Sequence, residues 1–214
     1  MKIAVLGTGM VGNTIATKLV ELGHEVKMGS RTADNAKAAE WVKAAGPKAS
    51  QGTFADAAAF GELAFNCTSG VGALPATQAA AKGLAGKVLI DVTNPLDFSK
   101  GMPPSLSVAN TDSLAEQIQR ALPETKVVKA LNTMNCKLMV NPSLLAGAHD
   151  AFLCGNDAGA KGKVKEILEG WFGWKTVHDL GDLSAARGQE MFVILWVRLM
   201  GALQTPMFNV HLVR

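Results

Sequence analysis

The chain has 214 residues, of which 48% are hydrophobic and 18% are charged, and its formal net charge is +3. This composition provides for a large apolar core and excludes a disordered chain. The positive charges form no block, so a nucleic-acid-binding face, which needs concentrated basic charge, is also excluded. At this length we expect a single α/β domain over residues 1–214.

The cysteines and histidines indicate no metal site. Cys67, Cys136 and Cys154 lie among apolar residues without a C-x-x-C motif, which predicts buried, reduced thiols in a cytoplasmic protein. The four histidines are scattered, with no partner at metal-ligand spacing. Glycines interrupt the apolar run at the start, so no signal peptide is predicted. The most apolar later segment, 191–200, is shorter than the ~20 residues that span a bilayer.

Predicted strands and helices alternate along the whole chain. Strands are expected at 2–6, 24–28, 62–67, 87–92, 126–131, 150–154 and 174–178. Helices are expected at 11–22, 33–45, 72–82, 112–121, 157–169 and 184–203, with Asp112 and Ser184 as candidate caps. Continuously apolar strands are typical of a parallel sheet covered on both faces. The alternation predicts a doubly wound parallel Rossmann sheet with a short C-terminal αβ extension and a hydrophobic last helix.

A glycine-rich turn, "GTGMVG", follows the first predicted strand and opens the first helix. Gly7 permits the tight turn, Gly9 lets the backbone approach a pyrophosphate, and Gly12 lets the helix pack against the strand. The helix amino end then offers free N–H groups to phosphate oxygens. The alternative is a tight turn with no ligand. The strand context favours dinucleotide binding.

The second strand ends in Ser30-Arg31-Thr32, where a protein that binds NAD carries an Asp or Glu for the ribose 2′-hydroxyl. The guanidinium of Arg31 and the two neighbouring hydroxyls suit the 2′-phosphate of NADP. A charge-assisted contact of this kind contributes roughly 1.5–3 kcal/mol. The alternative is a solvated surface arginine.

Several enzyme classes are excluded by missing residues. The chain has no tyrosine, so the Tyr-x-x-x-Lys proton relay is impossible, and it has neither a G-x-S-x-G elbow nor a phosphate-binding G-x-x-x-x-G-K-[ST] loop. The proline-containing segment 93–111 follows a strand, where ligands bind in open α/β sheets. Hydride transfer between two redox cofactors fits best, because it needs no catalytic acid or base from the protein.

Five motifs resemble a known family in order and spacing, over nearly the whole chain: "VLGTGMVG", "GSRT", "VVKALNT", "FLCGND" and "DLGDLSAARGQE". The chain resembles the F420-dependent NADP oxidoreductases, small Rossmann proteins that move hydride between NADPH and the deazaflavin F420. It is also similar to the nucleotide domain of the STEAP metalloreductases, which passes hydride from NADPH to a flavin.

The resemblance implies a role for each matching residue. The residues implied for NADP are Gly7, Thr8, Gly9, Met10, Val11, Gly12, Ser30, Arg31, Thr32, Cys67, Thr68, Ser69, Asn94 and Pro95. Those implied for the second cofactor are Asn132, Thr133, Met134, Ser184 and Arg187, so 132–214 would complete the acceptor site. The family carries a His where this chain has Asn132, and Ile-Pro-Trp near Thr68–Gly70. Both departures concern the acceptor side, so they leave open whether the acceptor is F420, FMN, FAD, a quinone or another compound.

Some of these residues also have structural interpretations. Asn94-Pro95 can simply end a strand, and Asn132 and Thr133 can satisfy local backbone groups. Arg187 opposes the helix dipole in the first turn of its helix, which favours a partner anion such as a ligand. The last helix is apolar on nearly every side and predicts a homodimer, unless the final residues wrap it.

Three functions therefore stay open. The first is an NADPH-dependent reductase of F420 or another flavin-like acceptor. The second is an NADP-dependent dehydrogenase or imine reductase of a small organic substrate, with Lys129, Lys137 or Ser69 as proton donor. The third is a non-catalytic NADP-binding sensor.

Overall fold

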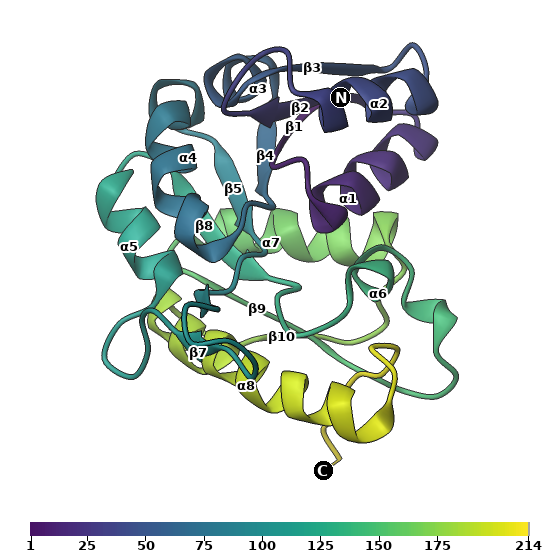
Figure 1. Ribbon diagram of the computed structural model, residues 1–214, viewed down its shortest axis with the longest axis vertical. Helices are drawn as coiled ribbons and strands as arrows, with labels where there is room; N and C mark the ends of the chain where they lie inside the picture. Colours follow the sequence, from purple (N-terminus) through teal and green to yellow (C-terminus); the bar gives the residue numbers. More distant parts are fainter. Residues whose placement is uncertain (214) are drawn as a thin grey trace.

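A computed structural model describes residues 1–213, which form one large sheet with helices on both faces (Figure 1). The strand order is β10-β9-β8-β5-β4-β1-β2-β3. The bounds are β1 Lys2–Leu6, β2 Glu25–Ser30, β3 Ala49–Thr53, β4 Leu63–Asn66, β5 Val88–Asp91, β8 Lys126–Ala130, β9 Ala151–Gly155 and β10 Val177–Asp179. The parallel strands β3-β2-β1-β4-β5-β8 have the order of the dinucleotide-binding fold, which confirms the predicted fold class.

The helices divide between two faces of the sheet. Their bounds are α1 Met10–Glu21, α2 Ala36–Ala45, α3 Phe54–Phe60, α4 Gly70–Leu84, α5 Leu114–Ala121, α6 Cys136–Val140, α7 Ala158–Glu166 and α8 Ala186–Leu203. One core contains residues of α1, α2, α6 and α7, and the other contains residues of α3, α4, α5 and the start of α8. Strand β1 supplies both cores, since Ile3 and Val5 face one and Ala4 and Leu6 the other.

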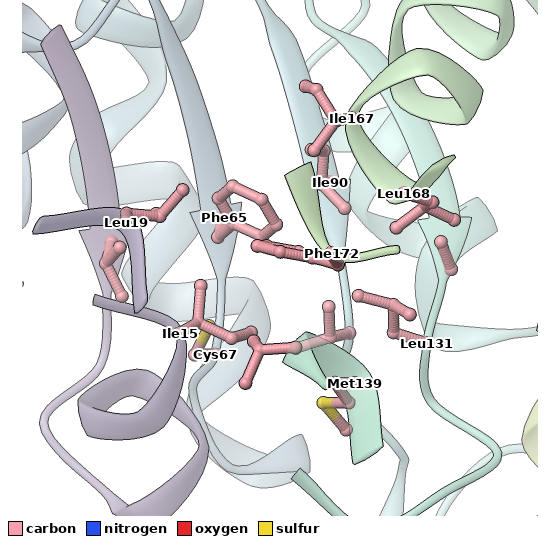
Figure 2. Packing of buried hydrophobic residues seen from close by; sticks show 14 of the residues in the cluster. Ile15, Leu19, Phe65, Cys67, Ile90, Leu131, Met139, Ile167, Leu168 and Phe172 are labelled. Atoms are coloured by element: carbon pink, nitrogen blue, oxygen red, sulfur yellow. The ribbon is translucent and has the colours of Figure 1, made fainter. Parts of the chain in front are cut away.

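The larger core lies between the sheet and the helices α1, α6 and α7 (Figure 2). Phe65 of β4 and Phe172 meet there with their ring centroids 6.3 Å apart. Figure 2 labels the residues that fill the space around them, Ile15, Leu19, Cys67, Ile90, Leu131, Met139, Ile167 and Leu168. All three cysteines are buried and free, as the sequence predicts.

Two predicted helix caps are wrong. Ser113, and not Asp112, caps α5 by accepting a hydrogen bond from the N–H of Glu116, because Asp112 is paired with Arg120. The last helix begins at Ala186, and no side chain caps it. The Ser184 hydroxyl donates to Asp182 in a preceding 3₁₀ turn.

Other elements differ from the sequence prediction as well. Strand β3 and helices α3 and α6 are additional, and β9 pairs antiparallel to β8. Strand β3, with the sequence ASQGT, carries no apolar run because it lies at the edge of the sheet. The segment 93–111 contains a small antiparallel pair, β6 Leu96–Asp97 and β7 Ser105–Leu106.

Helix α8 lies across one end of the molecule, drawn in yellow in Figure 1. One face of its first half is buried, through Ala186, Gln189, Glu190 and Val193. Met191, Leu195 and Leu203 are exposed, so a single chain does not bury the helix on both sides, contrary to the expectation for a helix that is apolar all round. The following segment covers part of the helix, since the Phe208 ring stacks on Trp196 with centroids 5.4 Å apart. No helix within residues 1–213 is long and apolar enough to cross a membrane.

Candidate functional site

The carboxyl ends of β1, β4, β5 and β8 approach one another closely. A Cβ atom at Gly7, which has a φ of +117°, would lie 2.6 Å from the carbonyl oxygen of Cys67. A Cβ atom at Gly70 would lie 2.3 Å from the carbonyl oxygen of Asn94. Asn94 in turn shares a hydrogen bond of 2.8 Å with Asn132. Glycine is therefore required at both contacts, and the glycine turn is connected to the end of β8.

A cavity of about 660 Å³ lies along this edge. It is bounded by the start of α1, the ends of β4 and β5, the segment 96–99, the start of α6, and α8. The predicted residues in its lining are Met10, Val11, Cys67, Thr68, Ser69, Asn94, Asn132 and Met134. The additional lining residues are Gly70, Val71, Val92, Thr93, Leu96, Asp97, Phe98, Ser99, Asn135, Cys136, Met139, Val193 and Trp196.

The glycine turn fits a pyrophosphate. Gly9 is the N-cap of α1 and offers no side chain, and the first turn of this helix has no acidic residue. The first N–H groups therefore have no side-chain partner, which is the arrangement that binds anions at a helix amino end. A Cβ atom at Gly9 would meet nothing within 4 Å, so this side of the turn is open. A Cβ atom at Gly12 would lie 2.1 Å from the carbonyl oxygen of Gly7, so the helix presses directly on the turn.

The residues after β2 present one free cation. Arg31 is exposed and forms no ion pair within residues 1–213. Thr32 is also exposed, whereas Ser30 is buried and its hydroxyl donates to the carbonyl oxygen of Thr32. A second cavity, of about 580 Å³, lies between α1 and α2 and is lined by Thr8, Gly9 and the exposed Lys37 among others. Sequence reasoning missed Lys37, although its place in the first turn after the Asn35 cap was a usable signal.

A buried ionic network joins β5, β8 and α8. Lys129 Nζ lies 2.8 Å from Asp91 Oδ2 and 2.8 Å from Glu190 Oε1, and none of the three side chains is more than 2% exposed. Burial alone would lower the pKa of Lys129, but the two carboxylates outweigh it and hold the pKa above its ordinary value. Lys129 does not line the cavity, so its interpretation as a proton donor for a small substrate is not supported.

Glu190 also joins two distant helices. Its carboxylate accepts hydrogen bonds from the backbone N–H groups of Leu114 and Ala115, at 2.8 and 3.1 Å, in the first turn of α5. The helix dipole of α5 stabilises the negative charge there. Helix α8 is therefore anchored both to α5 and to the centre of the sheet.

Two asparagines at the ends of β5 and β8 bind each other. Asn94 Nδ2 donates to the carbonyl oxygen of Asn132, and Asn132 Nδ2 donates to Asn94 Oδ1. Asn132 Nδ2 also donates to the carbonyl oxygen of Gln189 in α8, at 3.0 Å. Both asparagines line the cavity, and Pro95 and Thr133 do not.

Ser184 and Arg187 do not line the cavity either. The guanidinium of Arg187 binds the Glu116 carboxylate through Nε at 2.9 Å and Nη2 at 2.6 Å, and it lowers the pKa of Glu116. The anion that compensates Arg187 is thus part of the protein. Val193 and Trp196, further along α8, take the places in the cavity wall. Their i, i+3 spacing in the apolar helix was the signal that identifies one helix face.

The cavity wall offers little acid–base chemistry. Within residues 1–213, its ionisable lining residues are Asp97, Cys67 and Cys136, with no His, Lys, Arg or Glu among them. A hydrogen bond from the N–H of Ser99 lowers the pKa of Asp97, which keeps it ionised at neutral pH. Burial raises the pKa of the Cys67 thiol, which keeps it protonated. Neither group suits proton donation at neutral pH.

Residues 2–95 match the family model described as NADP oxidoreductase, coenzyme F420-dependent. The F420-dependent NADP reductase of Methanothermobacter marburgensis is 32% identical over 209 residues, which cover 93% of this chain and 92% of that protein. The chain belongs to the F420-dependent NADP oxidoreductase family. As a member of this family, it is an NADP-dependent oxidoreductase.

The chain is also similar to one further curated protein and to several solved structures. Metalloreductase STEAP3 of Rattus norvegicus is 30% identical over 192 residues. These residues are 88% of this chain but only 36% of STEAP3. The solved structure of an Arthrobacter sp. FB24 protein, provisionally described as an F420-dependent NADP reductase, is 51% identical, with full coverage of both chains and a TM-score of 0.94. A reductive aminase from Aspergillus terreus in complex with NADPH shares the fold, with 22% identity, a TM-score of 0.66, and coverage of 95% of this chain and 62% of that one.

Proposed function

We propose that this protein transfers a hydride between NADP(H) and a flavin-like acceptor, such as F420, at the carboxyl edge of the sheet. The observation that carries the proposal is the cavity of about 660 Å³, which runs from the start of α1 to Asn132 and α8. Among residues 1–213, no His, Lys, Arg or Glu lines it, Asp97 is held ionised, and the Cys67 thiol is held protonated by burial. Hydride transfer between two cofactors needs only alignment, whereas reduction of an imine or a ketone needs a proton donor as well.

The nucleotide would bind along the glycine turn. The pyrophosphate would lie at the amino end of α1, over the open side of Gly9, and the 2′-phosphate would bind Arg31 and Thr32. Lys37 of α2 would add a second cation on that side. Cys67, Thr68 and Ser69 would border the ribose and the nicotinamide, with Asn94 beneath the ring. The open turn, the uncapped helix and the unpaired Arg31 support this arrangement.

The acceptor would occupy the part of the cavity next to α8. Asn132, Met134, Val193 and Trp196 line it there, and Phe98 from the segment after β5 contributes an exposed apolar ring. Apolar walls with few polar groups are typical of sites for planar ring compounds. Ser184 and Arg187 have no contact in this proposal, because they lie outside the lining and bind Asp182 and Glu116.

The protein would act as a homodimer, with α8 at the interface. Met191, Leu195 and Leu203 are exposed by 39%, 53% and 53%, and a second copy of this helix would cover them. The test is the molar mass by light scattering after gel filtration. Leu195→Glu should turn the dimer into a monomer, because a charge would be buried without a partner. A wild-type monomer at high protein concentration would refute the homodimer.

Acceptor identity is tested by turnover. Purified protein is mixed with NADPH and, in separate cuvettes, with F420, FMN or FAD, and the acceptor absorbance band is followed. Enzyme-dependent bleaching of one band identifies the acceptor. Absence of bleaching with all three, while NADPH binds, would refute a flavin-like acceptor.

Nucleotide specificity is tested with Arg31→Ala. A charge-assisted hydrogen bond of about 1.5–3 kcal/mol corresponds to a loss of roughly ten- to hundredfold in affinity. The dissociation constant for NADPH should rise by at least tenfold, and that for NADH should stay nearly unchanged. Lys43→Ala, which removes a cation from the last turn of α2, is the matched control. Equal losses for both nucleotides would contradict the assignment of Arg31 to the 2′-phosphate.

A further inference from the structure

Asn132 carries a buried oxygen atom that receives no hydrogen bond. The side-chain Oδ1 has no partner among residues 1–213, and the residue is only 2% exposed. Both hydrogens of its Nδ2 are used, one toward Asn94 Oδ1 and one toward the carbonyl oxygen of Gln189. Turning the amide by 180° would place Oδ1 against these two oxygens. The orientation is therefore fixed, and Oδ1 can act only as an acceptor.

The position of this atom points to a ligand. Asn132 lines the cavity of about 660 Å³, and a buried carbonyl oxygen without a donor is unfavourable. A second lining residue, Trp196, has a buried indole Nε1–H group that donates no hydrogen bond to residues 1–213. Two unpartnered polar atoms of opposite character thus belong to residues in the wall of one cavity. An amide or a ring lactam carries an N–H donor next to a C=O acceptor and complements both.

We infer that Asn132 Oδ1 accepts a hydrogen bond from an amide-type N–H of a ring compound bound in the cavity. This inference rests on the proposed function, which supplies two sources of that group. One is the carboxamide of the nicotinamide, and the other is the lactam N–H of a flavin or deazaflavin. Asn132 selects the ligand by this contact and does not take up or release a proton, because an amide side chain does not titrate.

The first test changes the ligand and leaves the protein intact. Calorimetry on the wild type compares NADP⁺ with its 3-acetylpyridine analogue, whose acetyl group replaces the carboxamide and keeps only the C=O. It also compares lumiflavin with 3-methyllumiflavin, in which a methyl group replaces the lactam N–H. The pair that supplies the hydrogen bond should differ in Kd by about tenfold. If neither pair differs by more than twofold, the inference is refuted.

The second test changes the protein. Asn132→Leu keeps the number and branching of the side-chain heavy atoms but removes both Oδ1 and the two hydrogen bonds of Nδ2. It should weaken the N–H ligand by about tenfold, and the loss of the preference over the blocked analogue is the result that reports on Oδ1 itself. Gln51→Met is the matched control, because Gln51 Oε1 is also buried without a partner but lies on β3 at the far edge of the sheet. It should leave both ligand pairs unchanged. A preference that persists in a folded Asn132→Leu variant would overturn the role of Oδ1.

The same samples separate this inference from the proposed function. NADPH oxidation with lumiflavin or F420 is recorded beside the binding data. A ligand preference that depends on Asn132, without any turnover, supports the contact and contradicts the proposed reaction. Turnover without any preference supports the reaction and contradicts the contact.

Discussion

Replacing Lys129 with methionine would remove the only cation between two buried carboxylates in the described part of the chain. The ammonium lies 2.8 Å from an oxygen of Asp91 and from one of Glu190, with no side chain in this group more than 2% exposed. Removing one member of a buried ion pair typically costs 3–5 kcal/mol, because the remaining charge has no partner. The Lys129→Met variant should therefore be strongly destabilised at neutral pH.

The structure limits the size of this effect. Asp91 keeps the amide of Asn66 and the hydroxyl of Thr93, and Glu190 keeps two backbone N–H groups of α5. The variant can also bind a proton on one of the carboxylates. Raising a carboxyl pKa from about 4.3 to 7 corresponds to about 3.7 kcal/mol, which caps the electrostatic penalty at pH 7. We expect the free energy of unfolding to fall by about 3–4 kcal/mol at pH 7.

The pH dependence is the distinguishing result. In the folded variant one carboxyl would be protonated at pH 7, whereas in the unfolded chain it is ionised, so the folded state holds the extra proton. Stability relative to the wild type must then increase as the pH falls from 7. The deficit should shrink to about 1 kcal/mol at pH 5, at 1.36 kcal/mol per pH unit.

Equilibrium urea unfolding, followed by tryptophan fluorescence at pH 5, 6 and 7, measures these values. Lys126→Met is the control on the same strand, because Lys126 pairs with Asp157 at the surface, with 46% and 38% of the two side chains exposed. It should cost less than about 1 kcal/mol. A deficit below about 1 kcal/mol for Lys129→Met at pH 7, or one that does not change with pH, would refute the reasoning.

Two more predictions concern glycines and acid. Gly9→Ala should fold normally, because its Cβ atom would meet no protein atom within 4 Å. The same Cβ atom would occupy the space proposed for the pyrophosphate, so calorimetry should show NADPH binding weakened at least tenfold. Gly12→Ala should instead lower the melting temperature, because its Cβ atom would lie 2.1 Å from the carbonyl oxygen of Gly7. Unchanged NADPH affinity in Gly9→Ala would contradict a pyrophosphate at this turn. Arg120 lowers the pKa of Asp112 to about 2, so Asp112→Asn should cost less than about 1 kcal/mol above pH 4. Urea unfolding should show this difference disappearing as the pH falls through 2, and an unchanged difference there would contradict it.

The sequence predicted most of the sheet because its inner strands are continuously apolar. It predicted the glycine turn because the three glycines follow a strand and open a helix. It missed β3, whose polar residues suit an edge that no pattern of apolar residues marks. Helix α3 begins with a sequence signal, the Thr53-x-x-Asp56 spacing, whose two residues form reciprocal capping hydrogen bonds. Its alanine-rich sequence, however, shows no apolar stripe. The direction of β9 was not predictable, since a parallel and an antiparallel strand carry the same residues.

In the candidate site too, some residues were predicted from the sequence, and their partners from distant parts of the chain were not. Asn94 and Asn132, which follow strand ends, were named through the family resemblance, and both line the cavity. The partners of Lys129 and Arg187 were not, because Glu190 and Glu116 approach them from elements 61 and 71 positions away in the chain. The hypothesis that Lys129 donates a proton to a small substrate was not supported, because its ammonium is buried between two carboxylates and lies outside the cavity lining.

The position of Glu190 has a consequence for how the chain folds as it is synthesised. A nascent chain that ends before residue 190 contains β8 and α5, but it lacks the second counterion of Lys129 and the group that binds the first N–H groups of α5. The central strands and the Lys129–Asp91 ion pair can then form, yet the ammonium of Lys129 lacks its second carboxylate, and two N–H groups of α5 lack their acceptor, until the start of α8 leaves the ribosome. We therefore expect folding to be completed late, when Glu190 of the last helix joins β8 and α5.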